Sequence, residues 1–168
     1  MAHELKLKEG DAAPAFTASA NGGQTVSLAD FRGRPVILYF YPKDDTPGCT
    51  KEACAFRDLH GDLLKAKARV YGVSADDAES HAKFAAKFTL PFELIVDEAG
   101  KDGVPPLAKK LGAWQEKSMY GKTYMGIARI TYLVGPGGIV LQRSDRKFAL
   151  RRCGRSLSSA PLYAEANR

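Results

Sequence analysis

An unbroken apolar and aromatic run at residues 36–41 is followed closely by two cysteines, Cys49 and Cys54. The run favours a buried strand, and the segment from Thr46 onward favours a turn and then a helix. Cys49 therefore lies where a loop becomes a helix. Because backbone N–H groups at a helix start favour negative charge, a cysteine held there is stabilised as the reactive thiolate. This order of strand, turn, cysteine and helix predicts thiol redox chemistry.

The rest of the hydrophobic pattern alternates between strands and helices. Further strands are expected at residues 70–74 and 92–96, and a strong hairpin signal covers residues 129–141. Helices are expected from Cys49 to Ala68, from Asp76 or Asp77 to Phe88, and near residues 107–111, with a brief helical turn at residues 27–31. The pattern predicts an α/β fold of thioredoxin-like type, in which a mixed central sheet is flanked by helices in three layers.

Length and hydropathy favour one domain that is not embedded in a membrane. The chain has 168 residues, which is enough for one sizeable core, and 26% of its residues are charged. Its start lacks the long apolar stretch of a signal peptide, and no run approaches the roughly 18 apolar residues that span a bilayer. We therefore expect a cytoplasmic protein without a membrane partner.

The net charge of +6 is concentrated near the C-terminal end. Residues 143–168 carry +5, and the remainder of the chain is close to neutral. Single arginines without interleaved aromatic residues are weak support for a nucleic-acid-binding module, so we expect no nucleic-acid partner.

The cysteines and histidines do not follow the spacing of a metal site. Four residues separate Cys49 from Cys54, and His3, His60 and His81 form no ligand cluster with them. The same spacing disfavours a disulfide oxidoreductase or redox sensor acting on protein partners, because it is not the CxxC arrangement. We expect no zinc and no metal ligand set in this chain.

The segment Phe40–Asp58, FYPKDDTPGCTKEACAFRD, resembles the active-site segment of peroxiredoxins. The resemblance is greatest to the subgroup called bacterioferritin comigratory protein or peroxiredoxin Q. Residues 80–84, 90–92, 114–126 and 129–134 agree with the same subgroup. The family ends with a strand and a long amphipathic helix, which residues 143–168 do not resemble. We therefore expect a thioredoxin-like peroxiredoxin domain at residues 1–142 and an atypical basic tail at residues 143–168.

The resemblance implies an antioxidant thiol peroxidase and gives each site residue a role. Cys49 would attack the O–O bond as a thiolate and become a sulfenic acid. The Thr46 hydroxyl would bond the peroxide, Pro47 would shield the sulfenic acid from water, and Arg129 would stabilise the thiolate and orient the peroxide. No metal, haem or flavin cofactor is implied. Hydrogen peroxide and organic hydroperoxides would be the substrates, thioredoxin or a similar dithiol protein the reductant, and a monomer the favoured state.

Cys54 resembles the resolving cysteine of members that carry it on the same helix as the reactive cysteine. Five residues of helix separate two Cα atoms by about 7.5 Å along the axis and about 140° around it. A disulfide needs Cα atoms within about 7 Å and suitably directed Cβ atoms. We therefore predict that the first turn or two of the helix unwinds after Cys49 is oxidised. The alternative is that Cys54 is only a small buried residue of the helix.

Other polar and aromatic residues have simpler interpretations. Asp44 and Asp45 are interpreted as turn residues rather than an acid–base pair. His81 is expected on a solvent-facing side of its helix, and Cys153 is expected to be an incidental thiol. Three aromatic residues are expected to pack around the mouth of the site: Trp114, Tyr120 and Tyr124.

Overall fold

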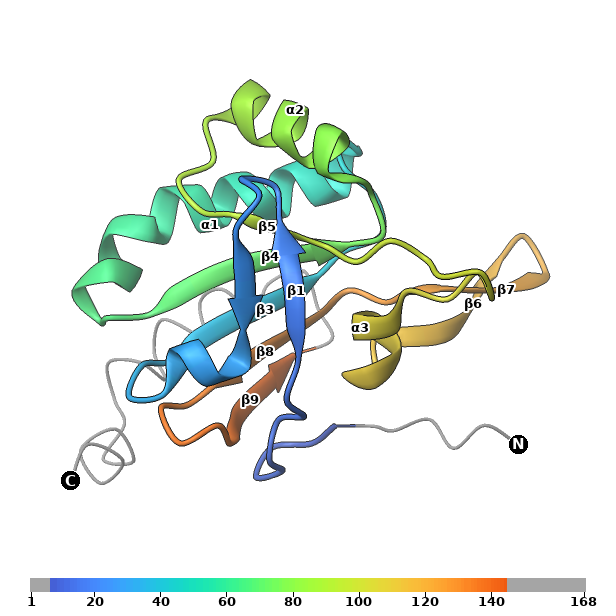
Figure 1. Ribbon diagram of the computed structural model, residues 1–168. Coiled ribbons are helices and arrows are strands. Elements are labelled where there is room, and N and C mark those ends of the chain that lie inside the picture. The colour runs from blue at the N-terminus through green and yellow to red at the C-terminus, as the bar shows by residue number, and fades with distance from the viewer. Residues whose placement is uncertain (1–6, 145–168) are drawn as a thin grey trace.

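The computed structural model describes residues 7–144 of the chain. Seven strands form one sheet in the order β2-β1-β5-β4-β3-β8-β9, and β6 and β7 pair separately (Figure 1). The strands are β1 (Thr17–Ala20), β2 (Thr25–Ser27), β3 (Val36–Phe40), β4 (Arg69–Ser74), β5 (Leu94–Val96), β6 (Trp114–Met119), β7 (Lys122–Ile127), β8 (Ile130–Val134) and β9 (Val140–Ser144). The helices are α1 (Pro47–Lys65), α2 (Ala78–Phe88) and α3 (Pro106–Lys110), with a 3₁₀ turn, η1, at Leu28–Phe31. None of the helices within residues 7–144 combines the length and the apolar character needed to cross a membrane.

β3 lies at the centre of the sheet, and all five of its residues are buried. It pairs in parallel with β4 and antiparallel with β8, while β4 pairs in parallel with β5. A strand covered on both faces needs apolar side chains on both, which the run at residues 36–41 provides. The predicted mixed direction of the sheet is confirmed.

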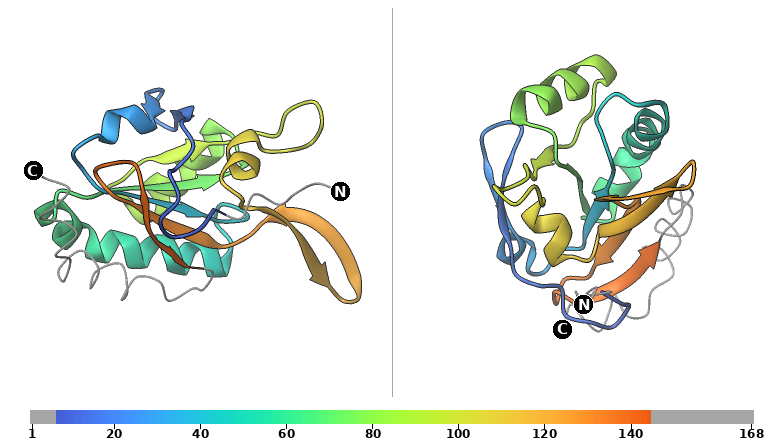
Figure 2. Two further views of the ribbon diagram at one scale, coloured as in Figure 1. Left: turned by 90° about the horizontal axis from the view of Figure 1, so that it is seen from below. Right: turned by 90° about the vertical axis from the view of Figure 1, so that its right-hand side faces the viewer.

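Successive side chains of β3 point to opposite faces of the sheet and form two cores. Tyr39 packs with Phe56 of α1 and Phe84 of α2 in one core. Leu38 belongs to the other core, which includes Leu107 of α3. Because helices lie on both faces of the sheet (Figure 2), the predicted three-layer, thioredoxin-like arrangement is confirmed.

Some boundaries differ from the sequence prediction. α1 begins at Pro47, two residues before the expected start, because proline is suited to the first position of a helix. It ends at Lys65, short of Ala68, because the chain closes a Schellman turn there with Lys67 at φ 58°. β9 pairs with β8 through Ser144, two residues past the predicted domain boundary. The rest of the predicted tail, Cys153 included, lies outside the described residues.

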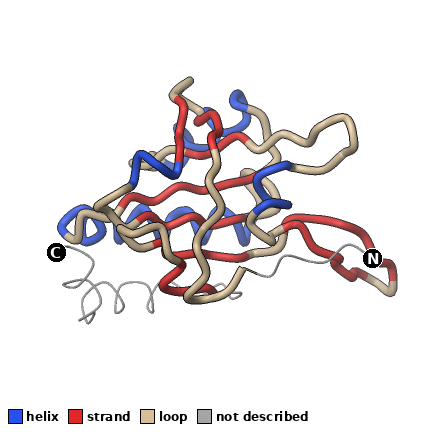
Figure 3. The backbone as a smooth tube through the Cα atoms, turned by 60° about the horizontal axis from the view of Figure 1, so that its bottom comes forward, coloured by secondary structure: helices blue, strands red, loops and turns tan. Residues whose placement is uncertain are grey.

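The hairpin of β6 and β7 was not predicted, and it projects from the body of the molecule (Figures 2 and 3). Tyr120 and Gly121 both have positive φ at its tip, as a type I′ turn requires. At its base, the Ala128 N–H donates to the Ala113 carbonyl at 2.8 Å. The next residue is Arg129, which directly precedes β8 at the centre of the sheet.

Candidate active site

The turn between β3 and α1 carries the first residues of the predicted site. Asp45 adopts φ 54° in this turn, a conformation that Asp tolerates better than most residues. Thr46 is the N-cap residue of α1, but its hydroxyl donates to the Lys43 carbonyl at 2.9 Å and does not cap the helix. Pro47 is exposed at the first helical position. The first turn of α1 therefore has no side-chain cap on its backbone N–H groups.

Cys49 lies in that first turn with its side chain 1% exposed. Arg129 Nη2 donates to Cys49 Sγ at a distance of 3.1 Å. The two residues meet because β3 and β8 are neighbours, with Phe40 paired to Ile130. A fixed guanidinium and the backbone donors of a helix start both favour a thiolate over a thiol. The geometry therefore places a buried sulfur beside a fixed positive charge at a helix start.

The guanidinium of Arg129 has capacity for a further ligand. Its Nη1 is buried and has no hydrogen-bond partner within residues 7–144. Buried donors in proteins are normally paired. An N–H group of this kind beside Cys49 can donate to an oxygen atom of a molecule that enters the site.

Lys117 of β6 is a second cation near the site, and the sequence analysis missed it. Its Nζ donates to the Ile127 carbonyl at 3.1 Å, so the side chain crosses the hairpin toward the segment that leads to Arg129. Burial and the neighbouring Arg129 charge lower the pKa of Lys117, while Cys49 opposes that change. Lys117 therefore belongs to the electrostatic environment of Cys49. Its only signal in the sequence was its place in the segment 114–126.

Cys54 lies on α1 as well, half-buried and with its thiol free. α1 is continuous from Pro47 to Lys65, so both cysteines are on one intact helix. Tyr39 lies beneath them, and burial, followed by the charges of Glu52, Asp44 and the two cysteines, raises the pKa of its phenol well above the usual value. The structure thus brings Cys49 and Arg129 into contact. It leaves Cys49 and Cys54 on different faces of one intact helix.

Two sequence-based interpretations are wrong. His81 is fully buried and contacts Asp44, so it does not face solvent. Asp44 lies in a turn, as expected, but its side chain is buried. Tyr120 is 97% exposed at the hairpin tip, so it does not pack around the site mouth, while Tyr124 of β7 is partly exposed. Trp114 is half-buried and packs against the core that contains Leu38.

Comparison with known proteins gives consistent matches. The profile described as the AhpC/TSA family matches residues 9–143. Peroxiredoxin Bcp of Bacillus subtilis is 43% identical over 138 residues, which cover 82% of this chain and 85% of that protein.

Solved structures agree with these matches. The bacterioferritin comigratory protein of Xanthomonas campestris is 37% identical with a TM-score of 0.72, over 90% of this chain and 92% of that one. Peroxiredoxin Q of the same organism is 36% identical with a TM-score of 0.75, over 97% and 99% of the two chains.

Proposed function

Because this chain belongs to the AhpC/TSA family, within the Bcp and peroxiredoxin Q group, and is a thiol peroxidase, we propose a cycle in which Cys49 attacks the peroxide and Cys54 resolves the product. One observation carries the proposal: Arg129 Nη2 lies 3.1 Å from a buried sulfur at the start of α1. A guanidinium and helix-start donors stabilise both the thiolate and the negative charge that develops as the O–O bond breaks.

In the first step the Cys49 thiolate attacks one oxygen of the peroxide. The S–O bond forms as the O–O bond breaks, the sulfur is oxidised to a sulfenic acid, and the other oxygen takes a proton and leaves as water or an alcohol. The buried Nη1 of Arg129 is available to donate to a peroxide oxygen. Thr46, the N-cap residue of α1, supplies a hydroxyl that bonds the peroxide. Pro47, the first residue of the helix, limits access of water to the sulfenic acid.

In the second step the Cys54 sulfur attacks the Cys49 sulfenic acid. The S–S bond forms, the S–O bond breaks, and the oxygen leaves as water. Intact helix separates the two Cα atoms by about 7.5 Å along the axis, so the first turn or two of α1 must unwind. The absence of a side-chain cap on that turn supports this step, because uncapped helix ends open at lower cost.

In the third step a dithiol protein, thioredoxin or one like it, reduces the disulfide and restores both thiols. The substrates are hydroperoxides, and we propose both hydrogen peroxide and organic hydroperoxides. Support for the organic class comes from the Xanthomonas campestris relative, whose structures concern alkyl peroxide reduction. We propose that the protein acts as a monomer in the cytoplasm, without a metal or other cofactor.

The test is peroxide turnover by the full chain with thioredoxin, thioredoxin reductase and NADPH. Cys49→Ser should abolish turnover. Cys54→Ser should reduce one equivalent of peroxide and then stall or over-oxidise, with recovery when a small thiol is added. Cys153→Ser is the matched control and should turn over like the wild type. Normal turnover by Cys54→Ser with thioredoxin would show that Cys54 is not the resolving residue.

A further inference from the structure

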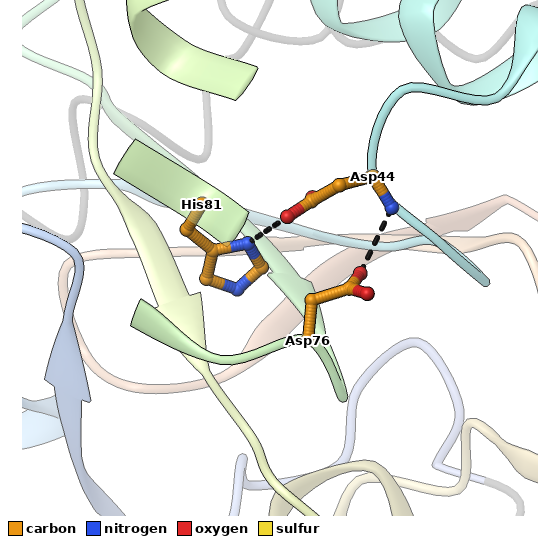
Figure 4. A group of neighbouring side chains, drawn as sticks. All are labelled: Asp44, Asp76 and His81. Carbon is orange, nitrogen blue, oxygen red and sulfur yellow. Dashed lines mark hydrogen bonds and ion pairs between the residues drawn. The ribbon is translucent and has the colours of Figure 1, made fainter. Parts of the chain in front are cut away.

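A buried polar network lies behind the turn that carries the site, and the cycle above does not use it. Its centre is the Asp44 carboxylate, which accepts hydrogen bonds from Tyr41 Oη at 2.5 Å and from Ser80 Oγ at 2.8 Å. His81 Nδ1 lies 2.7 Å from the same carboxylate (Figure 4). Burial, then the charges of Tyr39 and Asp44, raise the pKa of Tyr41 far above its usual value, so Tyr41 remains a neutral donor.

Both ring nitrogens of His81 face acceptors. Nε2 lies 2.9 Å from the Ile95 carbonyl, which can only accept, so Nε2 carries a proton. Nδ1 lies 2.7 Å from the Asp44 carboxylate, so a short hydrogen bond joins the two buried side chains. Removing one member of a buried pair leaves the other without its partner, which is costly. The hydrogen bonds of the network therefore hold His81 and Asp44 in fixed positions.

Asp44 is also held through its backbone. Its N–H donates to Asp76 Oδ2 at 2.8 Å (Figure 4). Ser74 Oγ donates to the same oxygen at 2.6 Å. The side chains of Asp44, Asp76 and His81 offer atoms within 4.8 Å of one another. These atoms already take part in hydrogen bonds within the network and with the backbone. We therefore interpret the group as a clamp that holds the turn, and not as a metal site.

The clamp and the helix start are adjacent but differ in how firmly they are held. Asp44 is fixed by bonds with Tyr41 just after β3, with Asp76 in the loop between β4 and α2, and with His81 of α2. Its neighbour Asp45 pairs with Lys87 of α2 at 2.8 Å. Beyond Thr46, the first turn of α1 has no side-chain cap and no acidic residue. The boundary between a fixed and a readily opened segment thus falls at Thr46.

We infer that His81, acting through Asp44, is a positioning residue that holds the turn before α1 and sets the point where unwinding begins. The inference rests on the proposed cycle. With the clamp closed, Thr46 and Cys49 stay aligned with Arg129, and only residues after Thr46 unwind. With the clamp weakened, the start of α1 frays in the reduced protein, so peroxide attack slows and the Cys49–Cys54 disulfide forms more readily.

The experiment compares the full-length wild type with His81→Asn. Two quantities are measured: the rate constant for Cys49 oxidation, from competition with a haem peroxidase, and the peroxide concentration at which half of Cys49 is over-oxidised, from mass spectrometry. We expect the rate constant to fall by about tenfold, which is less than the roughly 10²-fold that a displacement of reacting groups by about 1 Å can cost. We expect the over-oxidation midpoint to rise severalfold, because the faster disulfide competes with further oxidation.

Phe84→Leu is the matched control, because Phe84 is buried on the same helix and its ring lies beside those of Tyr41 and Phe88, but it has no polar atom that could bond Asp44. A general loss of stability would lower the rate constant of both variants without raising the midpoint. If His81→Asn behaves like Phe84→Leu, or shifts neither quantity, the inference is overturned.

Two further measurements keep the inference open to refutation. If His81→Asn does not fold, Tyr41→Phe removes a single bond to Asp44 and should shift both quantities in the same directions by smaller amounts. Unchanged values for a folded Tyr41→Phe would then overturn the inference. If the wild type itself forms no Cys49–Cys54 disulfide, the proposed cycle fails. By contrast, a wild type that cycles normally beside an unchanged His81→Asn overturns the inference alone.

Discussion

The two long helices of this protein begin in opposite ways. At the start of α2 the Asp77 side chain accepts the Ser80 N–H at 2.8 Å, and Glu79 adds a negative charge to the first turn. At the start of α1 the Thr46 hydroxyl faces the Lys43 carbonyl, and the first turn contains no acidic residue. Both helix starts have free backbone donors that favour an anion. Only α2 satisfies them with permanent carboxylates.

In the proposed cycle, the Cys49 thiolate supplies the negative charge that the start of α1 otherwise lacks. A thiolate in the first turn of α1 stabilises that turn, and the backbone N–H groups of the turn stabilise the thiolate. Oxidation to a sulfenic acid removes the charge, and a charge near a helix end is worth about 0.3–1 kcal/mol. It also weakens the pairing with Arg129. In the proposed cycle, the step that consumes the thiolate would therefore loosen the turn that opens before the disulfide forms.

The largest effect is expected from removing Arg129, the cation in contact with Cys49 at the start of α1. Arg129→Met should lower the rate constant of Cys49 oxidation by about 10²–10³, the usual loss for one preorganised donor to a developing charge. Alkylation of Cys49 by iodoacetamide at pH 7 should slow as well, because less thiolate is present. Stopped-flow peroxide assays and mass spectrometry of the alkylated protein measure the two effects.

Lys87→Met is the control for Arg129→Met. Lys87 is exposed and pairs with Asp45 at 2.8 Å, so the substitution removes one positive charge near the same turn. Exposed ion pairs contribute about 0–1 kcal/mol, so the rate should change by no more than about fivefold. Equal losses in the two variants would mean that general positive potential, and not contact with the sulfur, controls reactivity.

Local sequence patterns predicted the parts of the site that are adjacent in the chain. The strand, turn and cysteine at a helix start follow from residues 36–54, and the resemblance of residues 129–134 to the same family named Arg129. The distance between Arg129 and Cys49 depends on the neighbouring positions of β3 and β8, which no local pattern contains. The pairing of Asp44 with His81, 37 residues later, is of the same kind.

Other features had a signal that was not used. His81 lies three and seven residues before Phe84 and Phe88, on the apolar stripe of its own helix, and this spacing indicates burial. The β6–β7 hairpin was missed because its strands are short of apolar residues, but Tyr120-Gly121 between two extended runs is a turn signal. In both cases the prediction followed the polar residue types, although the positions of the residues along the chain carried the better signal.

A smaller effect is expected from removing the cap of α2. Asp77→Ala should lower the free energy of unfolding by about 1 kcal/mol, because one first-turn N–H of α2 loses its partner. Thr46→Ala should cost less than this, because the Thr46 side chain does not cap α1. Urea denaturation of both variants measures the difference. If Thr46→Ala costs as much as Asp77→Ala, the contrast between the two helix starts is wrong.

The smallest effect comes from adding to α1 the kind of charge that α2 already has. Lys51 is exposed two residues after Cys49, and Lys51→Glu places a carboxylate near the helix start, where it competes with the thiolate for the same backbone donors. An exposed charge there is worth about 0.5 kcal/mol, so the rate constant of Cys49 oxidation should fall about twofold at low salt and recover as salt screens the charge. Lys65→Glu at the far end of α1 is the matched control, since it makes the same change of charge at an exposed position roughly 20 Å away and should leave the rate unchanged. A salt-independent loss in Lys51→Glu, or an equal loss in Lys65→Glu, would show that negative charge at this helix start does not control the sulfur.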